Sequence, residues 1–159
     1  MHDEAAAEER RQWVVRIMEL QRHLVRKWEH EARTMPWPSQ LAGGLVDAAA
    51  LRSLDRETNL SAGELAHRLR MSESAITGVL NRLESRGLIA RERRERDRRV
   101  VRISMTDEGR KALAEADAIL MEQASRQVRN LSIEDLADMY NLLTKMAQGD
   151  GADLVDALS

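Results

Sequence analysis

The chain has 159 residues, which is long enough for one domain, or two closely fused ones, with a sizeable core. It has no cysteine, which excludes disulfide bonds, cysteine-ligated zinc and a catalytic or redox-sensing thiol. The net charge of −2 conceals a segregation, because residues 61–105 carry 11 basic and 6 acidic side chains, a net +5, and the remainder carries −7. A basic middle between acidic ends indicates a local anionic partner.

Phenylalanine is absent, so the predicted core is aliphatic. No apolar run approaches the roughly 18 residues that a membrane span needs. The first eleven residues are acidic and polar, unlike a signal peptide. We therefore expect a soluble, cytoplasmic protein.

Residues 3–33 contain neither proline nor glycine and predict one long helix. Its apolar residues recur every three or four positions and form one stripe: Trp13, Ile17, Leu20, Leu24 and Trp28. Pro36 and Pro38 end this segment, and a shorter helix over residues 45–54 follows. One copy of the chain has no obvious apolar surface that would bury the whole of this stripe.

Two helix starts then follow in quick succession. The segment Ser61-Ala62-Gly63-Glu64 is a capping box that opens a helix to about residue 69. Ser72 caps a second helix over residues 73–86, which Gly87 ends. Because only about three residues separate the two helices, they predict a helix-turn-helix.

The pattern then changes to the period of two that is typical of strands. Residues 88–92 and 100–105 predict a two-stranded hairpin with an arginine-rich tip. Helices follow over residues 107–130, capped by Thr106, and from Ser132 onward, before a tail over residues 149–159. We expect three regions: residues 1–44, a long helix and a Pro/Gly loop; residues 45–106, the helix-turn-helix and hairpin; and residues 107–159, two helices and the tail.

The helix over residues 73–86 has two contrasting faces. Ile76, Val79, Leu80 and Leu83 fall within one arc and predict a core face. The other arc and its flanks carry small or polar residues, which suit close approach to a major groove and contact with base edges. The alternative is an ordinary solvent face. The DNA-binding residues expected here are Ser72, Ser74, Thr77, Gly78, Asn81 and Arg82.

The hairpin tip is the most basic part of the chain. Arginines on a thin β-ribbon beside a recognition helix can reach phosphates or a narrow minor groove, and Arg96, Arg98 and Arg99 are the candidates. Asp97 would hold one of them in place through a charge-assisted hydrogen bond. The alternative is a solvated loop. We favour a wing, which makes the fold a winged helix-turn-helix.

Five segments together resemble the MarR family of transcriptional regulators. They are Ser61 to Ala66, Met71 to Thr77, Leu83 to Arg91, Asp97 to Arg99 and Ile103 to Gly109, in the same order and spacing. The resemblance is strong over residues 45–113 and looser in the flanking helices. It implies a mainly α fold, a winged helix-turn-helix with a two-stranded β-wing between N- and C-terminal dimerisation helices. It also implies a wing arginine, Arg98 or Arg99, in the minor groove and Asp97 as its brace.

The implied homodimer agrees with the uncovered apolar stripe. The residues expected at the dimer interface are Trp13, Ile17, Leu20, Leu24, Leu120, Leu136 and Leu143. A twofold dimer places its recognition helices about one helical turn apart, about 34 Å, so the operator should be an inverted repeat.

Many proteins of this family release DNA when a small anionic, often aromatic, ligand binds. Trp28, His30, Arg33 and Trp37 combine aromatic faces with cations and are the candidate effector pocket. A core position for Trp28 and solvent positions for His30 and Arg33 are the alternatives. Pro36-Trp37-Pro38 departs from the family's loop.

Other functional classes have less support in the sequence. There is no nucleotide-binding loop or nucleophile elbow, so we expect neither an enzyme nor a bound cofactor. His23 and His30 lack the carboxylate–histidine cluster of a metal site, so no metal is expected. A winged helix that docks another protein without binding DNA is the main alternative, and it would need apolar anchors on the exposed face. We expect a bacterial regulator, most simply a repressor.

Overall fold

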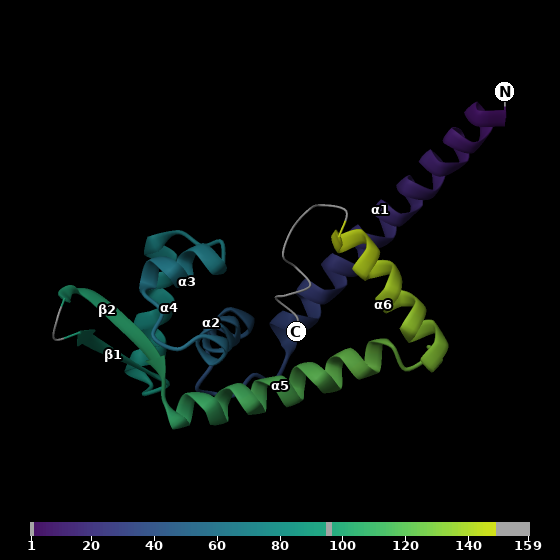
Figure 1. Ribbon diagram of the computed structural model, residues 1–159. Helices are drawn as coiled ribbons and strands as arrows, with labels where there is room; N and C mark the ends of the chain where they lie inside the picture. The colour runs from purple at the N-terminus through teal and green to yellow at the C-terminus, as the bar shows by residue number, and fades with distance from the viewer. Residues whose placement is uncertain (1, 95–96, 149–159) are drawn as a thin grey trace. The chain divides into compact units, whose positions relative to one another are not determined.

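The computed structural model describes the backbone of residues 2–94 and 97–148, with the side chains of residues 2, 3, 93, 94, 97–100, 147 and 148 not described. Within these ranges the chain is mainly helical, with one two-stranded antiparallel sheet (Figure 1). The contacts divide the chain into two units, residues 1–119 and 120–159. No helix within the described ranges is long and apolar enough to cross a membrane.

The first helix, α1, spans His2–Thr34 and confirms the predicted long helix. It ends two residues before Pro36, which cannot supply a backbone N–H to continue the ladder. The loop that follows turns back onto the helix end, because the indole Nε1 of Trp37 donates to the carbonyl oxygen of Ala32 at 2.9 Å. The next helix, α2, spans Leu45–Arg56, two residues longer than predicted.

The helix-turn-helix is formed by α3, Ala62–Arg68, and α4, Glu73–Ser85. The predicted capping box is present, since Ser61 Oγ accepts from the Glu64 backbone N–H at 3.2 Å and Glu64 Oε2 accepts from the Ser61 backbone N–H at 2.6 Å. Ser72 Oγ caps α4 by accepting from the Ala75 N–H at 3.2 Å. The chain leaves α4 through Gly87, whose φ of 71° is easily reached only by glycine.

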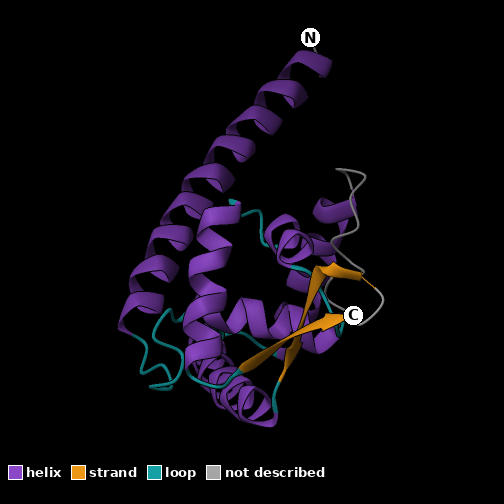
Figure 2. Ribbon diagram, turned by 90° about the vertical axis from the view of Figure 1, so that its left-hand side faces the viewer, coloured by secondary structure: helices purple, strands orange, loops and turns teal. Residues whose placement is uncertain are grey.

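The hairpin consists of β1, Ile89–Arg94, and β2, Asp97–Met105 (Figure 2). It confirms the predicted hairpin but is longer, with Ile89 opposite Met105 and Arg93 opposite Val101. At its base, Ile103 donates its backbone N–H to Leu60 at 2.8 Å and forms a bridge that the sequence pattern does not predict. This bridge ties β2 to the chain entering α3.

Two helices complete the described chain. Thr106 Oγ1 caps α5, Asp107–Gln127, by accepting from the Gly109 N–H at 3.0 Å. This helix ends three residues earlier than predicted. The last helix, α6, spans Ile133–Gln148, and Ser132 and Asp135 exchange capping hydrogen bonds at its start. The tail over residues 149–159 lies outside the described residues.

The core lies within the first unit, in the part that contains the helix-turn-helix and the hairpin, here called the winged part. Its buried apolar side chains come from residues 41–116, and among the described residues it contains no buried aromatic side chain, as predicted. Burying each leucine or isoleucine contributes about 1.5–3 kcal/mol. The core therefore fixes α2, α3, α4 and the base of the hairpin as one body. Its fully buried aliphatic side chains are Leu41, Leu51, Leu54, Leu60, Leu65, Ile76, Leu80, Leu83, Leu88 and Ile103.

Candidate nucleic-acid interface

Helix α4 presents one buried and one exposed face, as the sequence predicts. The side chains of Ile76, Val79, Leu80 and Leu83 are buried against the core. The opposite face is exposed and carries no large apolar side chain. The exposed face is formed by Ser74, Thr77, Gly78, Asn81 and Ser85.

The hydroxyl groups on and beside this face are partly engaged within α4 itself. Thr77 Oγ1 donates to the Glu73 carbonyl oxygen at 2.7 Å, and Ser85 Oγ donates to the Arg82 carbonyl oxygen at 2.9 Å. Ser72 and Ser74 share a hydrogen bond of 3.1 Å at the helix start. The first N–H groups of a helix have no intrahelical acceptor, so this end of α4 suits a phosphate oxygen.

A Cβ atom built on Gly78 would meet no heavy atom within 4 Å. Nothing inside the described chain therefore requires glycine at this position, although glycine weakens a helix interior by about 1 kcal/mol relative to alanine. The prediction that this face of α4 approaches DNA closely is one reason for a glycine here, and it stays a prediction.

Arg82 has a structural partner that sequence reasoning missed. Its Nη2 donates to Asp47 Oδ1 at 2.6 Å, and its Nε lies 3.2 and 3.1 Å from the two carboxylate oxygens. Asp47 is fully buried on α2 and also accepts from the Gly43 N–H at 2.7 Å. The hydrogen bonds to Asp47 raise the pKa of Arg82 above its ordinary value. The predicted DNA-contacting arginine thus ties α4 to α2, and only about a third of its side chain is exposed.

A second unpredicted contact joins α4 to the hairpin. Arg91 on β1 donates from Nη2 to Asn81 Oδ1 at 2.8 Å, and its Nη1 lies 3.3 Å from Glu84 Oε2. Asn81 and Glu84 lie on α4 and Arg91 lies on β1, so no periodic pattern within one element reveals the contact. Arg91 also lines a hollow of about 350 Å³ between the helix-turn-helix and the hairpin, with Thr77 and Ile103 among its neighbours.

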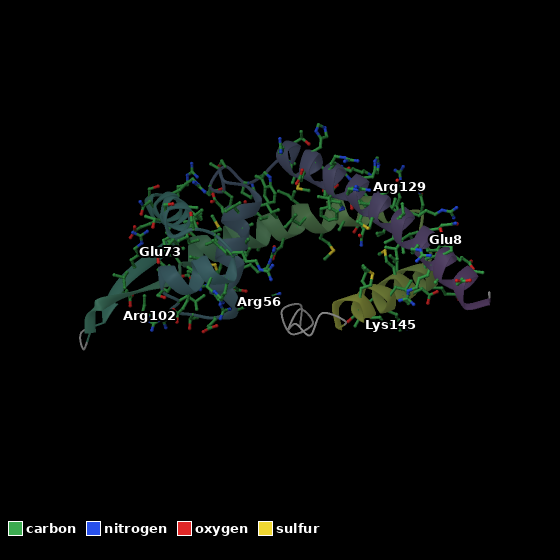
Figure 3. The ribbon with its side chains drawn as sticks, turned by 90° about the horizontal axis from the view of Figure 1, so that it is seen from above. Glu8, Arg56, Glu73, Arg102, Arg129 and Lys145 are labelled. Carbon is green, nitrogen blue, oxygen red and sulfur yellow. The ribbon has the colours of Figure 1, made fainter. Side chains whose placement is uncertain are left out.

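The base of the hairpin is anchored by Arg102 on β2, labelled in Figure 3. Its Nη1 donates to Glu64 Oε2 at 2.8 Å and to the Asn59 carbonyl oxygen at 3.2 Å. Hydrogen bonds with Ser61 are the main cause that lowers the pKa of Glu64, and the Arg102 charge lowers it further. Arg86 likewise donates to the Gln40 carbonyl oxygen at 3.2 Å. Some arginines of the basic segment therefore hold the fold together.

The predicted wing-tip residues are only partly covered by the structure. Arg96 lies outside the described residues, and so do the side chains of Asp97, Arg98 and Arg99. The backbone places Asp97 opposite Arg94 at the start of β2, beyond an irregularity in the register. The bracing role of Asp97 and the DNA contacts of the arginines stay predictions.

The candidate effector residues line two hollows. Trp28 lines one of about 370 Å³ with Leu24, Val25 and other residues of α1, and Trp37 and Arg33 line one of about 300 Å³ beside Gly43 and Gly44. Ala32 and Leu45 line both hollows, whereas His30 lines neither. Trp28 is 42% exposed within the single chain, so it is not part of that chain's own core.

Five of the seven predicted dimer-interface residues are exposed in the single chain. On α1 the exposed fraction of Trp13, Ile17, Leu20 and Leu24 ranges from 43% to 59%. In the second unit Leu143 is 56% exposed, while Leu120 and Leu136 are half-buried. Rows of exposed apolar side chains on this scale indicate a surface that another molecule covers.

Three comparisons place this geometry among known proteins. The model of the MarR family matches residues 45–101. The HTH-type transcriptional repressor MdtR of Bacillus subtilis is 34% identical over 103 residues, which are 65% of this chain and 66% of MdtR, just under two thirds of its length. The crystal structure of YusO from Bacillus subtilis superposes with a TM-score of 0.62 at 27% identity, covering 84% of this chain and 96% of YusO.

A fold match without close sequence similarity extends the comparison. A MarR family protein from Bacillus stearothermophilus superposes with a TM-score of 0.72 at 23% identity, covering 89% of this chain and 97% of that one. The winged helix-turn-helix with its flanking helices is therefore the fold of this chain.

Proposed function

Since this chain belongs to the MarR family, we propose that it is a transcriptional repressor that binds DNA as a homodimer and releases it when a small effector binds. The repressor activity rests on the similarity to MdtR.

The observation that carries the proposal is the exposed face of α4. It is small and polar, and it lies in a segment with a net charge of +5 within a chain of net charge −2. Basic charge supplies most of the non-specific affinity for DNA, and polar side chains on a recognition helix supply base contacts. The protein-docking alternative needs apolar anchors on this face, and the described residues of α4 provide none.

The proposed dimer covers the open apolar faces. Burial of one large apolar side chain contributes about 1.5–3 kcal/mol, so the four predicted interface residues of α1, all of them exposed in the single chain, offer a strong driving force. A twofold axis would place the two α4 helices about 34 Å apart, in successive major grooves of one duplex. The operator we propose is accordingly an inverted repeat.

The proposed effector site is the pair of hollows at the end of α1. Trp28 and Trp37 supply aromatic surfaces and Arg33 supplies a cation, which together suit a small aromatic anion. Gly43 lies at the wall of one hollow and donates to Asp47, the partner of Arg82 on α4. An occupant that displaces Gly43 would thus disturb the attachment of the recognition helix.

Selection of binding sequences from fully randomised duplex DNA with the purified protein tests this proposal. We expect enrichment of an inverted repeat whose half-sites are about one helical turn apart. No enrichment by folded protein at any salt concentration would contradict it and favour the protein-docking alternative.

A further inference from the structure

We infer that a hydrogen bond from Arg91 occupies the amide oxygen of Asn81, so that Asn81 contacts base edges only through its N–H donors. Asn81 thereby selects guanine over adenine in the operator. This inference rests on the proposed function, because it assumes that α4 enters a major groove. It concerns one side chain and its preference, so it can fail while the proposed function stands.

The geometry fixes the orientation of the Asn81 amide. Asn81 is exposed on the same face of α4 as Ser74 and Gly78. The contact with Arg91 measures 2.8 Å. A guanidinium group has only N–H donors, so the atom that it contacts must be the amide oxygen. The amide nitrogen, with its two N–H donors, is thereby left without a partner among the described residues.

An asparagine with both groups free recognises adenine by pairing its oxygen with N6–H and its nitrogen with N7. With its oxygen engaged by Arg91, Asn81 offers donors alone. Guanine presents two adjacent acceptors, N7 and O6, in the major groove, whereas adenine places an N6–H donor beside N7. Donors facing O6 and N7 are complementary, and a donor facing N6–H is not.

The charge of Arg91 adds to this preference. The amide oxygen of Asn81 keeps a second lone pair, but a guanidinium group beside it repels an approaching donor and attracts an acceptor. Glu84 lies on α4, as Asn81 does, and its Oε2 is 3.3 Å from Nη1 of Arg91. This contact holds the guanidinium group beside Asn81. Arg91 is therefore a positioning residue for base recognition, because it acts through Asn81.

The test compares base preferences of full-length variants on one randomised duplex library. The proteins are the wild type, Asn81→Ala, Arg91→Lys, Arg91→Met and Arg86→Met. The last is a control that also removes one arginine, because Arg86 contacts Gln40 and not Asn81. At the position where Asn81→Ala loses discrimination, the wild type should enrich guanine. Arg91→Lys, which keeps one donor, should retain guanine, and Arg91→Met should shift the guanine-to-adenine ratio on the order of tenfold toward adenine. Arg86→Met should leave that ratio unchanged.

A second measurement uses only the wild type and Asn81→Ala, so it tests the inference even if Arg91→Met fails to fold. Replacing the enriched guanine by 7-deazaguanine removes the N7 acceptor, and this should weaken binding of the wild type several-fold but leave Asn81→Ala unaffected. Adenine at the Asn81-dependent position, an unchanged ratio in folded Arg91→Met, or no position that depends on Asn81 would overturn the inference. Failure of the wild type to enrich any sequence would instead reject the proposed function, and the inference with it.

Discussion

Arg82 on α4 donates three hydrogen bonds from Nε and Nη2 to the fully buried carboxylate of Asp47, the shortest measuring 2.6 Å. The backbone N–H of Gly43 completes the shell of Asp47 at 2.7 Å. A buried carboxylate without such donors would carry a large desolvation cost, so the three groups must stay together. The position of α4 is thus coupled to the loop that follows α1.

Replacing Arg82 should therefore affect folding before it affects DNA recognition. Arg82→Ala leaves Asp47 charged and buried, which we expect to lower the free energy of unfolding by about 3 kcal/mol. Urea unfolding measures this loss. The double variant Asp47→Leu with Arg82→Met removes both charges and should recover most of the stability. An equally unstable double variant would show that packing, and not the unpaired charge, dominates.

Gly78→Ala separates a docking face from a solvent face. Because a Cβ atom has open space there, the variant should gain up to about 1 kcal/mol of stability from its higher helix propensity. If α4 approaches DNA closely, the same methyl group should weaken binding. Thermal unfolding and fluorescence anisotropy on one preparation provide both readouts. A more stable protein with unchanged DNA affinity would assign Gly78 to ordinary solvent.

The wing arginines are expected to act on phosphates or the minor groove. Arg98→Ala with Arg99→Ala should weaken DNA binding and reduce the slope of log affinity against log salt by about 1 to 2. The dimer should remain intact, because neither residue belongs to the predicted dimer interface. A salt series by anisotropy measures the slope, and a slope equal to that of the wild type would reject the wing hypothesis.

Trp13 tests the proposed dimer interface. Trp13 is 55% exposed in the single chain, and the Arg16 guanidinium lies 5.1 Å from the centroid of its ring. If a second copy covers it, Trp13→Ala should shift the equilibrium toward monomer by about 2 kcal/mol per chain. Sedimentation velocity across a concentration series follows this shift. A stable wild-type monomer would refute the interface.

Acid should loosen the contact between α3 and the hairpin. The pKa of Glu64 is lowered in the folded chain by Ser61 and Arg102, so its contribution to stability is complete above the ordinary carboxyl pKa and is lost as the pH falls through the lowered value. The stability difference between the wild type and Glu64→Gln should therefore shrink in that acidic window. Asp107 and Asp135 also have a lowered pKa and contribute to the acid sensitivity of both proteins. The difference between the wild type and Glu64→Gln therefore isolates the contribution of Glu64. A difference that stays constant would contradict the assignment.

The helices of the winged part could be predicted because their causes are local. The capping box at Ser61, the cap at Ser72 and the apolar spacing of Ile76, Val79 and Leu83 all operate within a few residues. The predicted hairpin was confirmed for the same reason, since alternation and Gly87 mark it.

The contacts between elements leave no local pattern in the sequence from which they could be predicted. Asp47 and Arg82 lie 35 residues apart, and an isolated aspartate among alanines on α2 is the only sequence feature that could have suggested a buried partner. Arg91 and Asn81 meet because β1 passes α4, which depends on the tertiary packing of the core. Arg82 therefore looked like a surface arginine in the sequence, whereas the fold engages it.

Two copies of the chain are proposed to read one specific DNA sequence, and a single titration can test this. The selected duplex and a scrambled duplex of equal length and composition are titrated by anisotropy, with sedimentation giving the stoichiometry. We expect two chains per duplex and an affinity for the selected sequence at least about a thousandfold above that for the scrambled one at physiological salt. Equal affinities, or one chain per duplex, would contradict sequence-specific binding by a dimer.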